Sequence, residues 1–474
     1  TRISAEDVNA GRLHVHALNV RLSIFQIYYG AYPHCHRWEI VLSDQYQPCA
    51  GQNFYYSEMP LQYEMERTNA PYRDEEHFVS FYDFDALENV KVPKRVEIHD
   101  VTLRDGEQQA GVIFRKDDKV KIASALAEAG VDRVEAGMPA VSDQDFEAVK
   151  EIAHLRIGSK VYAFARCMIP DVDLALKADV DGVVMEIPSS DHLIERGYGW
   201  TVEKAMELPI AATKYAHEHG LKVVFFTIDA TRAPFDTFWG IVGRVAREGY
   251  MDSLAVADTF GVLSPHGALR FMEKVRSVVD KPIEIHAHND FGLGVANTVM
   301  AVLGGASVVH VSVNGIGERS GNTPLEDTVM ALKYLYGVNV NVNMKHLRKL
   351  SKLVSELSGV PVPPQKAVVG DNLFTVESGI ITGWYRRIEK LGDLLEMFPY
   401  KPSVTGHENV KIVVGKKSGI DTIYYKAEKM GIQLTEEEAL RVLGAVKEIS
   451  LARKGLLSDE ELRSLIKLVK PGPS

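Results

Sequence analysis

From Arg95 onward, short runs rich in β-branched and other apolar residues alternate with helical segments, and this rhythm constrains the fold more than any other feature of the chain. Strands that alternate with helices indicate βα units and a parallel sheet. Eight such strands over roughly 220 residues are typical of a TIM barrel, so we expect an α/β fold of the (β/α)8 type. The expected strands are Arg95–His99, Arg133–Ala136, Val161–Ala165, Gly182–Glu186, Lys222–Phe226, Ser253–Ala257, Ile283–His286 and Val308–Val313.

A doubly wound parallel sheet is the alternative for this pattern. In that fold a glycine-rich phosphate loop usually follows the first strand, and none follows Arg95–His99 here. The next segment, Asp117–Ala129, carries Ile122 and Leu126 on one face and is followed by Gly130, the pattern of a capped amphipathic helix. The barrel is therefore the preferred interpretation.

With 474 residues the chain is longer than a barrel requires and has room for appended segments. The strand rhythm stops after Tyr336, so we assign residues 91–340 to a catalytic barrel and residues 341–474 to C-terminal α-rich subdomains. The run Val360–Gln365 contains three prolines and cannot continue a helix, so it separates the last barrel helix from the C-terminal extension. Further helices are expected at Asn343–Leu357, Glu436–Ala452 and Ser458–Lys467.

Residues 1–90 form a third region, an N-terminal extension that is rich in Tyr, His and Phe and has little periodicity. Short strands are expected at His16–Val20 and Glu39–Leu42, and the polar segment Glu66–Glu76 is typical of a linker or a surface loop. Because its aromatic content suits burial, we predict that the extension packs on the barrel or on a partner subunit and helps to cover the site.

The composition of the chain limits the cellular location and the classes of binding partner that we expect. A formal net charge of −10 argues against nucleic acid and anionic membranes as partners. No apolar run approaches the roughly 20 residues of a membrane helix. The three cysteines, Cys35, Cys49 and Cys167, cannot build a disulfide framework, so we expect a cytoplasmic protein. The run His34-Cys35-His36 lacks further ligands at suitable spacing and is not assigned to a metal.

Polar residues gather where the strands end, which is where the active sites of TIM barrels lie. The seventh strand runs into His286 and His288, which are two residues apart and therefore share one face of the strand. Asp105 follows the first strand. Two imidazoles and a carboxylate form a mixed nitrogen and oxygen site for a divalent ion such as Mn²⁺, Zn²⁺ or Mg²⁺. A structural histidine pair is the alternative, and the position at a strand end favours the metal.

Three further residues at strand ends are candidate catalytic groups. Arg104 is expected to hold a substrate carboxylate or to stabilise an oxyanion, or else to form a salt bridge in the barrel mouth. Thr259 is expected to donate to a carboxylate or to cap the helix that follows it. Glu135 is expected to orient Arg104 or a metal ligand, or to be a structural ion-pair partner.

Other strand-end residues carry weaker signals. Gln108 and Arg166 follow the first and third strands and are candidates for substrate binding, and the fourth strand ends at Glu186. The two glycines Gly315 and Gly317 indicate a tight loop in preference to a nucleotide site.

Three motifs of this chain together resemble those of the isopropylmalate, homocitrate and citramalate synthases, a metal-dependent superfamily that includes 3-hydroxy-3-methylglutaryl-CoA lyase. The resemblance covers roughly residues 95–470. It extends to Glu377-Ser378-Gly379 and Gly415-Lys416-Lys417-Ser418-Gly419, which are similar to the C-terminal subdomains of that family. The three motifs are Thr102-Leu103-Arg104-Asp105-Gly106-Glu107-Gln108, His286-Ala287-His288-Asn289-Asp290 and Asn314-Gly315-Ile316-Gly317-Glu318-Arg319.

The resemblance implies a reaction and roles for individual residues. The reaction is a Claisen-type condensation, in which the enolate of an acyl-CoA attacks the ketone of a 2-oxo acid and the thioester is then hydrolysed. Arg104 would polarise the carbonyl group of the 2-oxo acid, and Thr259 would hold its carboxylate. A homodimer is also implied. The metal ligands would be Asp105, His286 and His288, with Asn322 at or near the ion.

Three positions depart from the family pattern. Synthases carry a Glu before Asp-Ala-Thr-Arg, a His after Glu-Ser-Gly-Ile and a His in the Gly-Lys-His-Ser-Gly motif, and this chain has Ile228, Ile381 and Lys417 there. The first two positions serve acid/base chemistry, and isoleucine cannot transfer a proton.

The departures leave two alternatives to a synthase. One is a lyase or aldolase that cleaves a related 2-hydroxy acid or CoA ester with another base. The other is a catalytically silent homologue kept for binding or regulation. The candidate bases are His99, His192, Tyr162 and Tyr198.

Overall fold

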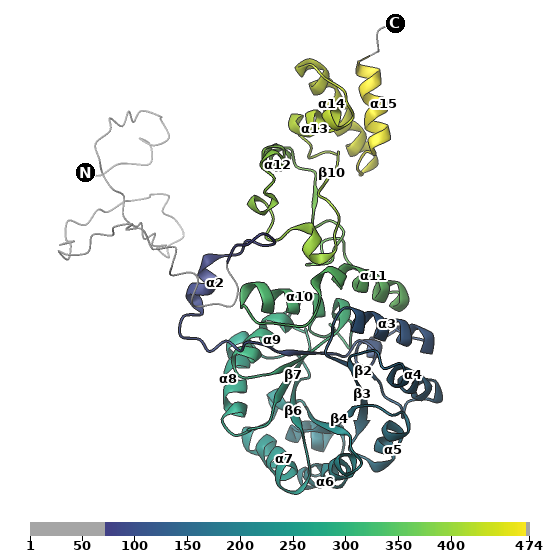
Figure 1. The fold of residues 1–474 in the computed structure, drawn as a ribbon, viewed down its shortest axis with the longest axis vertical. Coiled ribbons are helices and arrows are strands. Elements are labelled where there is room, and N and C mark those ends of the chain that lie inside the picture. Colours follow the sequence, from purple (N-terminus) through teal and green to yellow (C-terminus); the bar gives the residue numbers. More distant parts are fainter. Residues whose placement is uncertain (1–71, 471–474) are drawn as a thin grey trace, which may run out of the picture. The chain divides into compact units, whose positions relative to one another are not determined.

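The computed structural model describes residues 72–470 and contains a closed barrel of eight parallel strands (Figure 1). Each strand pairs with the next one in the chain, and β8 closes the barrel against β1, where Glu97 lies opposite Val308. The expected TIM barrel is therefore confirmed. The strands are β1 (Glu97–Asp100), β2 (Arg133–Gly137), β3 (Lys160–Arg166), β4 (Gly182–Pro188), β5 (Lys222–Ile228), β6 (Ser253–Asp258), β7 (Ile283–Ala287) and β8 (Val308–Val311).

Helices follow the strands and surround the barrel, as Figure 1 shows. Within residues 72–470 no helix combines the length and the apolar character needed to cross a membrane. The helices of this part are α3 (Lys116–Glu128), α4 (Asp143–His154), α5 (Ile169–Lys177), α6 (Val202–Glu218), α7 (Phe235–Glu248), α8 (Pro265–Arg276), α9 (Gly294–Leu303) and α10 (Leu325–Met330). A short helix, α2 (Phe81–Ala86), precedes the first strand, and α11 (Leu347–Ser358) follows the barrel.

The alternation of side chains along each strand builds two apolar layers. On β5, Val223 and Phe225 belong to the large core that includes the surrounding helices. Their neighbours Val224 and Phe226 belong to a separate cluster inside the barrel. Successive side chains of a strand point to opposite faces, so one strand supplies both layers.

The barrel interior is divided into an apolar half and a polar half. The apolar cluster comes from β3 to β6 and comprises Tyr162, Phe164, Val184, Val224, Phe226, Ala255 and Ala257. The strands β1, β2, β7 and β8 instead supply buried ionisable side chains, namely His99, Glu135, Glu284, His286 and His310. Buried polar groups are costly unless they are paired, so the polar half must form a connected network.

Most element boundaries agree with the sequence-based expectation to within two residues. Strand eight was predicted two residues too long, because the backbone leaves the sheet after Val311 and turns tightly at Val313–Gly315, where Asn314 has a φ of 60°. The helix expected at Asn343–Leu357 begins with a single tight turn, Met344–His346, before α11. The strands expected at His16–Val20 and Glu39–Leu42, and the packing of the N-terminal extension, lie outside the described residues.

The described residues that follow α11 contain a two-stranded parallel sheet and four α-helices. The strands are β9 (Thr375–Val376) and β10 (Lys411–Ile412), and the helices are α12 (Gly379–Leu391), α13 (Ile420–Lys429), α14 (Glu436–Arg453) and α15 (Asp459–Val469). The helices α12 and α13 begin against one another at Gly379 and Gly419. A Cβ atom added to Gly379 would overlap the backbone of Gly419, so this approach requires a residue without a side chain.

We predict that Gly379→Ala destabilises the protein by about 1–3 kcal/mol, because the added methyl group must separate the two helix starts. Gly444→Ala is the matched control: Gly444 lies exposed inside α14 with no atom near its Cβ position. Alanine there should gain about 0.5–1 kcal/mol through helix propensity. Chemical unfolding followed by circular dichroism measures both, and equal stabilities of the two variants would contradict the prediction.

Candidate active site

Asp105, His286 and His288 lie together at the C-terminal ends of β1 and β7, and all three are buried. The two imidazole Nε2 atoms are 3.3 Å apart, and the Nε2 atom of His286 is 3.7 Å from Oδ2 of Asp105. His286 is the last inward-facing residue of β7, and His288 follows it two positions later. The strand alternation therefore aims both rings at the space above Asp105.

The protonation states of these groups are those of metal ligands. Burial alone would raise the pKa of the Asp105 carboxyl, but the charge of Arg104 and the nearby histidines outweigh it and hold that pKa well below its usual value. Burial lowers the pKa of His286 well below its usual value and also lowers that of His288. An ionised carboxylate beside neutral imidazoles is the form that binds a divalent ion.

The spacing of the donor atoms also fits an ion. Two nitrogens that each lie about 2.1 Å from a shared ion, at an angle of about 100°, are about 3.2 Å apart. Asn322 adds a fourth group, because its Nδ2 donates to Oδ1 of Asp105 at 2.8 Å while its own buried Oδ1 has no hydrogen-bond partner. The residues present therefore fit a divalent ion, and Asn322 orients the carboxylate that would bind it.

Arg104 is held rigidly beside this group. Its Nη1 donates to Oδ2 of Asp105 at 2.6 Å, its Nε donates to Oε1 of Glu135, and its guanidinium lies 3.9 Å from the ring centre of Phe164. Its Nη2 is buried and has no hydrogen-bond partner. A buried guanidinium nitrogen without a partner is costly, so its N–H groups are available for an oxygen of a bound substrate.

Glu135 connects Arg104 to a second buried network. Its Oε2 lies 3.1 Å from Nε2 of His99, whose ring stacks on His310 with 4.3 Å between ring centres. His310 Nε2 in turn lies 2.8 Å from Oε2 of Glu284. The network continues to Arg133, whose Nη1 donates to Glu284 at 2.8 Å and whose other nitrogens bind Glu97. It thus runs along the polar half of the barrel from one end toward the other.

This second network is also rich in metal-ligand types, because His99, Glu284 and His310 form a compact buried group. The Nε2 atoms of both histidines already face carboxylates. Burial lowers the pKa of His99 to about 4, so its ring is neutral at neutral pH. Burial would raise the pKa of Glu284, but the hydrogen bond from His310 and the charge of Arg133 hold it well below its usual value. The Nε2 atoms and the carboxylates of this network pair with one another, whereas Nδ1 of His99 and Nδ1 of His310 have no hydrogen-bond partner. Because the carboxylates are already engaged, we interpret the network as structural.

The loop after β8 depends on glycine at two points. A Cβ atom at Gly321, where φ is 87°, would overlap the carbonyl oxygen of Gly315. A Cβ atom at Gly317 would overlap the amide of Asn322. The glycines therefore make the tight turn that brings Asn322 onto Asp105.

The remaining expected site residues differ in whether other side chains or the backbone already occupy their hydrogen-bonding groups. The hydroxyl of Thr259 accepts the backbone N–H of Asp229 at 2.8 Å and keeps its own proton for a ligand. Gln108 is exposed, and its side chain makes no hydrogen bond within residues 72–470. Arg166 donates through Nε and Nη2 to both oxygens of Asp171, which fixes it at the start of α5. That pairing with a residue five positions later was not expected, and it weakens Arg166 as a substrate ligand.

The four candidate bases are unequally placed. His99 is fully buried under Glu135, and Tyr162 lies in the barrel interior, where burial raises its pKa to about 12. Burial also raises the pKa of Tyr198 to about 12. His192 is partly exposed and its Nε2 lies 3.1 Å from Oδ2 of Asp229, a carboxylate that Arg232 also binds through two nitrogens. His192 is the only one of these four with both access and a partner that could orient it.

Two of the three positions that depart from the family pattern, Ile228 and Ile381, carry no acid or base. Ile228 ends β5 and packs on the apolar cluster inside the barrel. Ile381 packs in the small core formed by β9, β10 and α12. Lys417 is largely exposed, and its Nζ lies 3.7 Å from Oε2 of Glu377. Both isoleucines are thus held by apolar neighbours.

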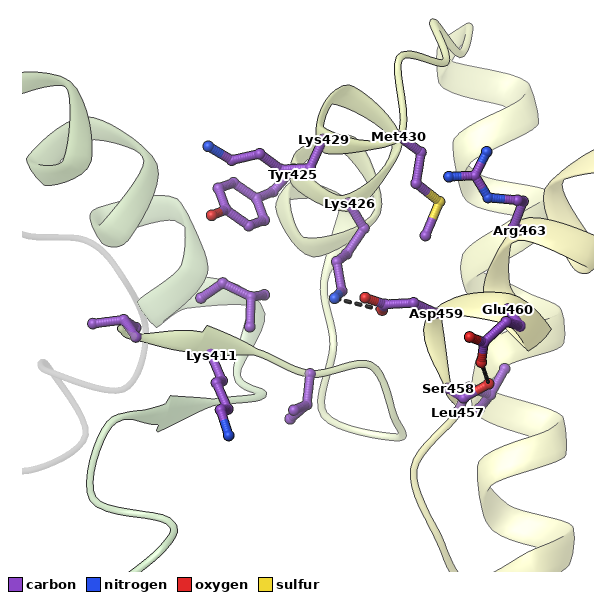
Figure 2. A pocket seen from close by; sticks show the side chains of 13 residues that line it. Lys411, Tyr425, Lys426, Lys429, Met430, Leu457, Ser458, Asp459, Glu460 and Arg463 are labelled. Atoms are coloured by element: carbon purple, nitrogen blue, oxygen red, sulfur yellow. Dashed lines mark hydrogen bonds and ion pairs between the residues drawn. The ribbon is translucent and has the colours of Figure 1, made fainter. Parts of the chain in front are cut away.

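Two cavities lie away from the C-terminal ends of the barrel strands. One, of about 650 Å³, lies between β10, α13 and the start of α15 (Figure 2), and there Lys426 is paired with Asp459 at 2.5 Å. The other, of about 580 Å³, lies at the N-terminal ends of the strands beside Glu97 and Arg133, which bind each other. Because their charges are largely paired, the chemistry is concentrated at the C-terminal end of the barrel.

Comparison with known proteins agrees with this geometry. The family model described as HMGL-like matches residues 95–354. The probable 2-isopropylmalate synthase of Methanopyrus kandleri is 43% identical over 358 residues, which cover 76% of this chain and 70% of that protein. Homocitrate synthase AksA of the same organism is 40% identical over 82% of this chain and 96% of its own length. (R)-citramalate synthase CimA of Methanocaldococcus jannaschii is 39% identical over 79% of this chain and 74% of its own length.

A solved structure supports the fold. The HMG-CoA lyase of Bacillus subtilis superposes with a TM-score of 0.53 at 21% identity, covering 57% of this chain and 96% of that chain. At this identity the likeness shows the barrel and not the reaction.

We predict that the purified protein binds about one divalent ion per chain at the Asp105 site, and that the ion raises its melting temperature. Asp105→Asn removes the charged ligand and should weaken the binding by more than about 100-fold, since loss of a mere supporting group costs 10- to 100-fold. Elemental analysis after dialysis and titration calorimetry measure this. His266→Gln, at an exposed position on α8, is the control. Unchanged metal content in Asp105→Asn would contradict the assignment.

We also predict that His99 makes the protein acid-sensitive. Its pKa is about 4 in the folded state, below the usual value of 6.5, so the unfolded chain takes up the proton first as the pH falls. The contribution of neutral His99 to the free energy of unfolding is therefore fully present above pH 6.5. It is lost as the pH falls from 6.5 to 4, by up to about 3 kcal/mol. Unfolding at several pH values should show a shallower loss for His99→Gln than for the wild type. Identical slopes would show that the proposed titration of His99 is wrong.

Proposed function

Because the chain belongs to the HMGL-like family, we propose that it is a metal-dependent acyltransferase that condenses an acyl-CoA with a 2-oxo acid. The observation that carries this proposal is the free Nη2 of Arg104 beside the group Asp105, His286 and His288. A small anion at this position could bind both the guanidinium of Arg104 and an ion held by the neighbouring group. A 2-oxo acid has adjacent ketone and carboxylate oxygens, which suit a site of this kind.

Each residue has a proposed task in this reaction. Asp105, His286 and His288 would hold the ion, with Asn322 supporting Asp105. When bound, a divalent ion supplies Lewis acidity and a template for the two oxygens of the 2-oxo acid. The mixed nitrogen and oxygen donors favour Mn²⁺ or Zn²⁺, with Mg²⁺ as the harder alternative.

Arg104 and Thr259 complete the proposed substrate site. Arg104 donates from Nη2 to the ketone oxygen, which becomes an alkoxide when the new C–C bond forms, so the guanidinium stabilises charge that develops in the transition state. The Thr259 hydroxyl donates to the substrate carboxylate while it accepts the N–H of Asp229. Glu135 positions Arg104 through its Nε and leaves Nη2 directed at the substrate.

We further propose that the protein forms a homodimer through α12. This helix buries Thr382 and Tyr385, and on its opposite face it exposes Ile380, Trp384 and Leu391, with exposed fractions of 72%, 50% and 77%. An exposed apolar stripe of this kind is typical of a contact surface.

We predict that the wild type releases free CoA from acetyl-CoA when a suitable 2-oxo acid and a divalent ion are present, which a thiol reagent follows. The assay tests neutral and acidic 2-oxo acids of increasing side-chain size. Arg104→Lys keeps the charge but loses the planar fork, so kcat/KM should fall by at least about 100-fold. Arg270→Lys, on the exposed face of α8, is the control.

Two results would contradict the acyltransferase. Cleavage of a 2-hydroxy acid without thioester-dependent CoA release would point to a lyase or aldolase. A metal-loaded protein inert toward every acyl-CoA and 2-oxo acid tried would point to a silent homologue.

A further inference from the structure

The candidate site contains a carboxylate to which the proposed function assigns no task. Glu186 lies near the end of β4, and it shares its strand face with Val184, a member of the apolar cluster inside the barrel. The alternation of β4 therefore directs Glu186 inward, on the apolar side of the interior and near the barrel mouth. Among residues 72–470 no hydrogen bond or ion pair of its side chain is present.

The electrostatic surroundings of Glu186 place it beside the substrate-binding groups. The charge of Arg104 acts on Glu186, and the charge of Glu186 acts in turn on Arg104 and Tyr198. Glu186 is partly buried. A partly buried carboxylate that has no partner is unfavourable for folding, because burial costs it solvation that a hydrogen bond or an ion pair would replace. Such groups are typical of functional sites.

Glu186 also lies close to the position where this chain has lost a carboxylate. In the register of β4 and β5, Pro188 lies opposite Ile228 and Glu186 lies opposite Phe226. Glu186 is thus on the adjacent strand and one inward-facing position deeper than Ile228. Neighbouring strands are about 4.8 Å apart and two residues span about 6.6 Å, so side chains from the two positions can reach the same space.

The ionisation of Glu186 is consistent with a role in proton transfer. Burial raises its pKa, and the charges of Arg104 and Arg166 only partly offset this effect. A carboxylate with a raised pKa is a stronger base than an exposed one and is better matched to a weakly acidic C–H group at neutral pH.

We propose that Glu186 is the proton acceptor that forms the enolate of the acyl-CoA, in place of the carboxylate absent at position 228. An oxygen of its carboxylate takes a proton from the α-carbon. The electron pair of that C–H bond becomes the C–C double bond of the enolate, and the thioester carbonyl oxygen takes the electron pair of its π bond. The enolate carbon then forms the new bond to the ketone carbon of the 2-oxo acid, and the ketone oxygen takes the electron pair of its π bond. This inference rests on the proposed acyltransferase activity.

His192 is the competing candidate, since Asp229 orients it at the end of β4. However, Arg232 and Ser190 also bind the Asp229 carboxylate, and the Asp229 residue has a left-handed backbone with a φ of 58°. These contacts already neutralise the Asp229 carboxylate, so its ion pair with His192 is part of a structural network at the C-terminal end of the barrel. Glu186, by contrast, is partly buried without a hydrogen-bond or ion-pair partner among residues 72–470.

The test compares Glu186→Gln, His192→Gln and the control Glu195→Gln, which changes an exposed carboxylate in the same loop region. Metal content and circular dichroism confirm that each variant is loaded and folded. For Glu186→Gln we expect kcat for CoA release to fall by at least about 100-fold, with KM for the 2-oxo acid within threefold of the wild type. The other two variants should keep most of the activity. A gain of at least tenfold when Ile228→Glu is added to Glu186→Gln would support a shared task of the two positions.

Three results overturn the inference while leaving the acyltransferase intact. The first is an active wild type whose Glu186→Gln variant keeps more than half of kcat. The second is a variant that raises KM with kcat unchanged, which would make Glu186 a binding group. The third is loss of kcat in His192→Gln but not in Glu186→Gln. If the wild type itself releases no CoA, the acyltransferase proposal fails, and this outcome is separate from the other three.

Discussion

The buried guanidinium of Arg104 is the interaction on which the rest of the site depends. It neutralises two carboxylates at once, Asp105 at the barrel mouth and Glu135 inside the barrel, and it rests on the ring of Phe164. Without it, two buried negative charges would lose their nearest positive partner, a change that typically costs several kcal/mol. The same contacts fix the direction of Nη2. The contacts of Arg104 therefore both stabilise the fold and orient the N–H groups of its Nη2.

Much of this arrangement could be predicted from the sequence, because a barrel converts position along a strand into position in space. The spacing of His286 and His288 places both on one side of β7, and Asp105 follows a strand that lies two places away around the closed barrel. The division of the interior into polar and apolar halves could not be predicted. Whether His99, Glu284 and His310 point inward or outward depends on the register of each strand, and composition and periodicity leave that register open.

Hydrogen bonds between individual side chains also cannot be predicted from motifs. Arg166 follows a strand and has the chemistry of a substrate ligand, yet Asp171 engages it through two hydrogen bonds. Glu186 has a less distinctive sequence context, and only its inward direction and its lack of a partner single it out. In both cases the decisive fact is what surrounds the side chain. A motif states the residue type and says nothing of its neighbours.

The divided interior has a consequence for how such an enzyme can change over time. The polar half is a connected chain of ion pairs, hydrogen bonds and one pair of stacked rings that runs from Asp105 to Glu97, so a substitution in it disturbs several partners at once. The apolar half on β3 to β6 is held mainly by packing, although the rings of Phe164 and Tyr162 also face Arg104 and Arg133. Volume-conserving changes elsewhere in this half are tolerated comparatively well. New substrate preferences can therefore arise on the apolar side of the barrel while the polar side stays constant. One scaffold can accommodate a family of related reactions in this way.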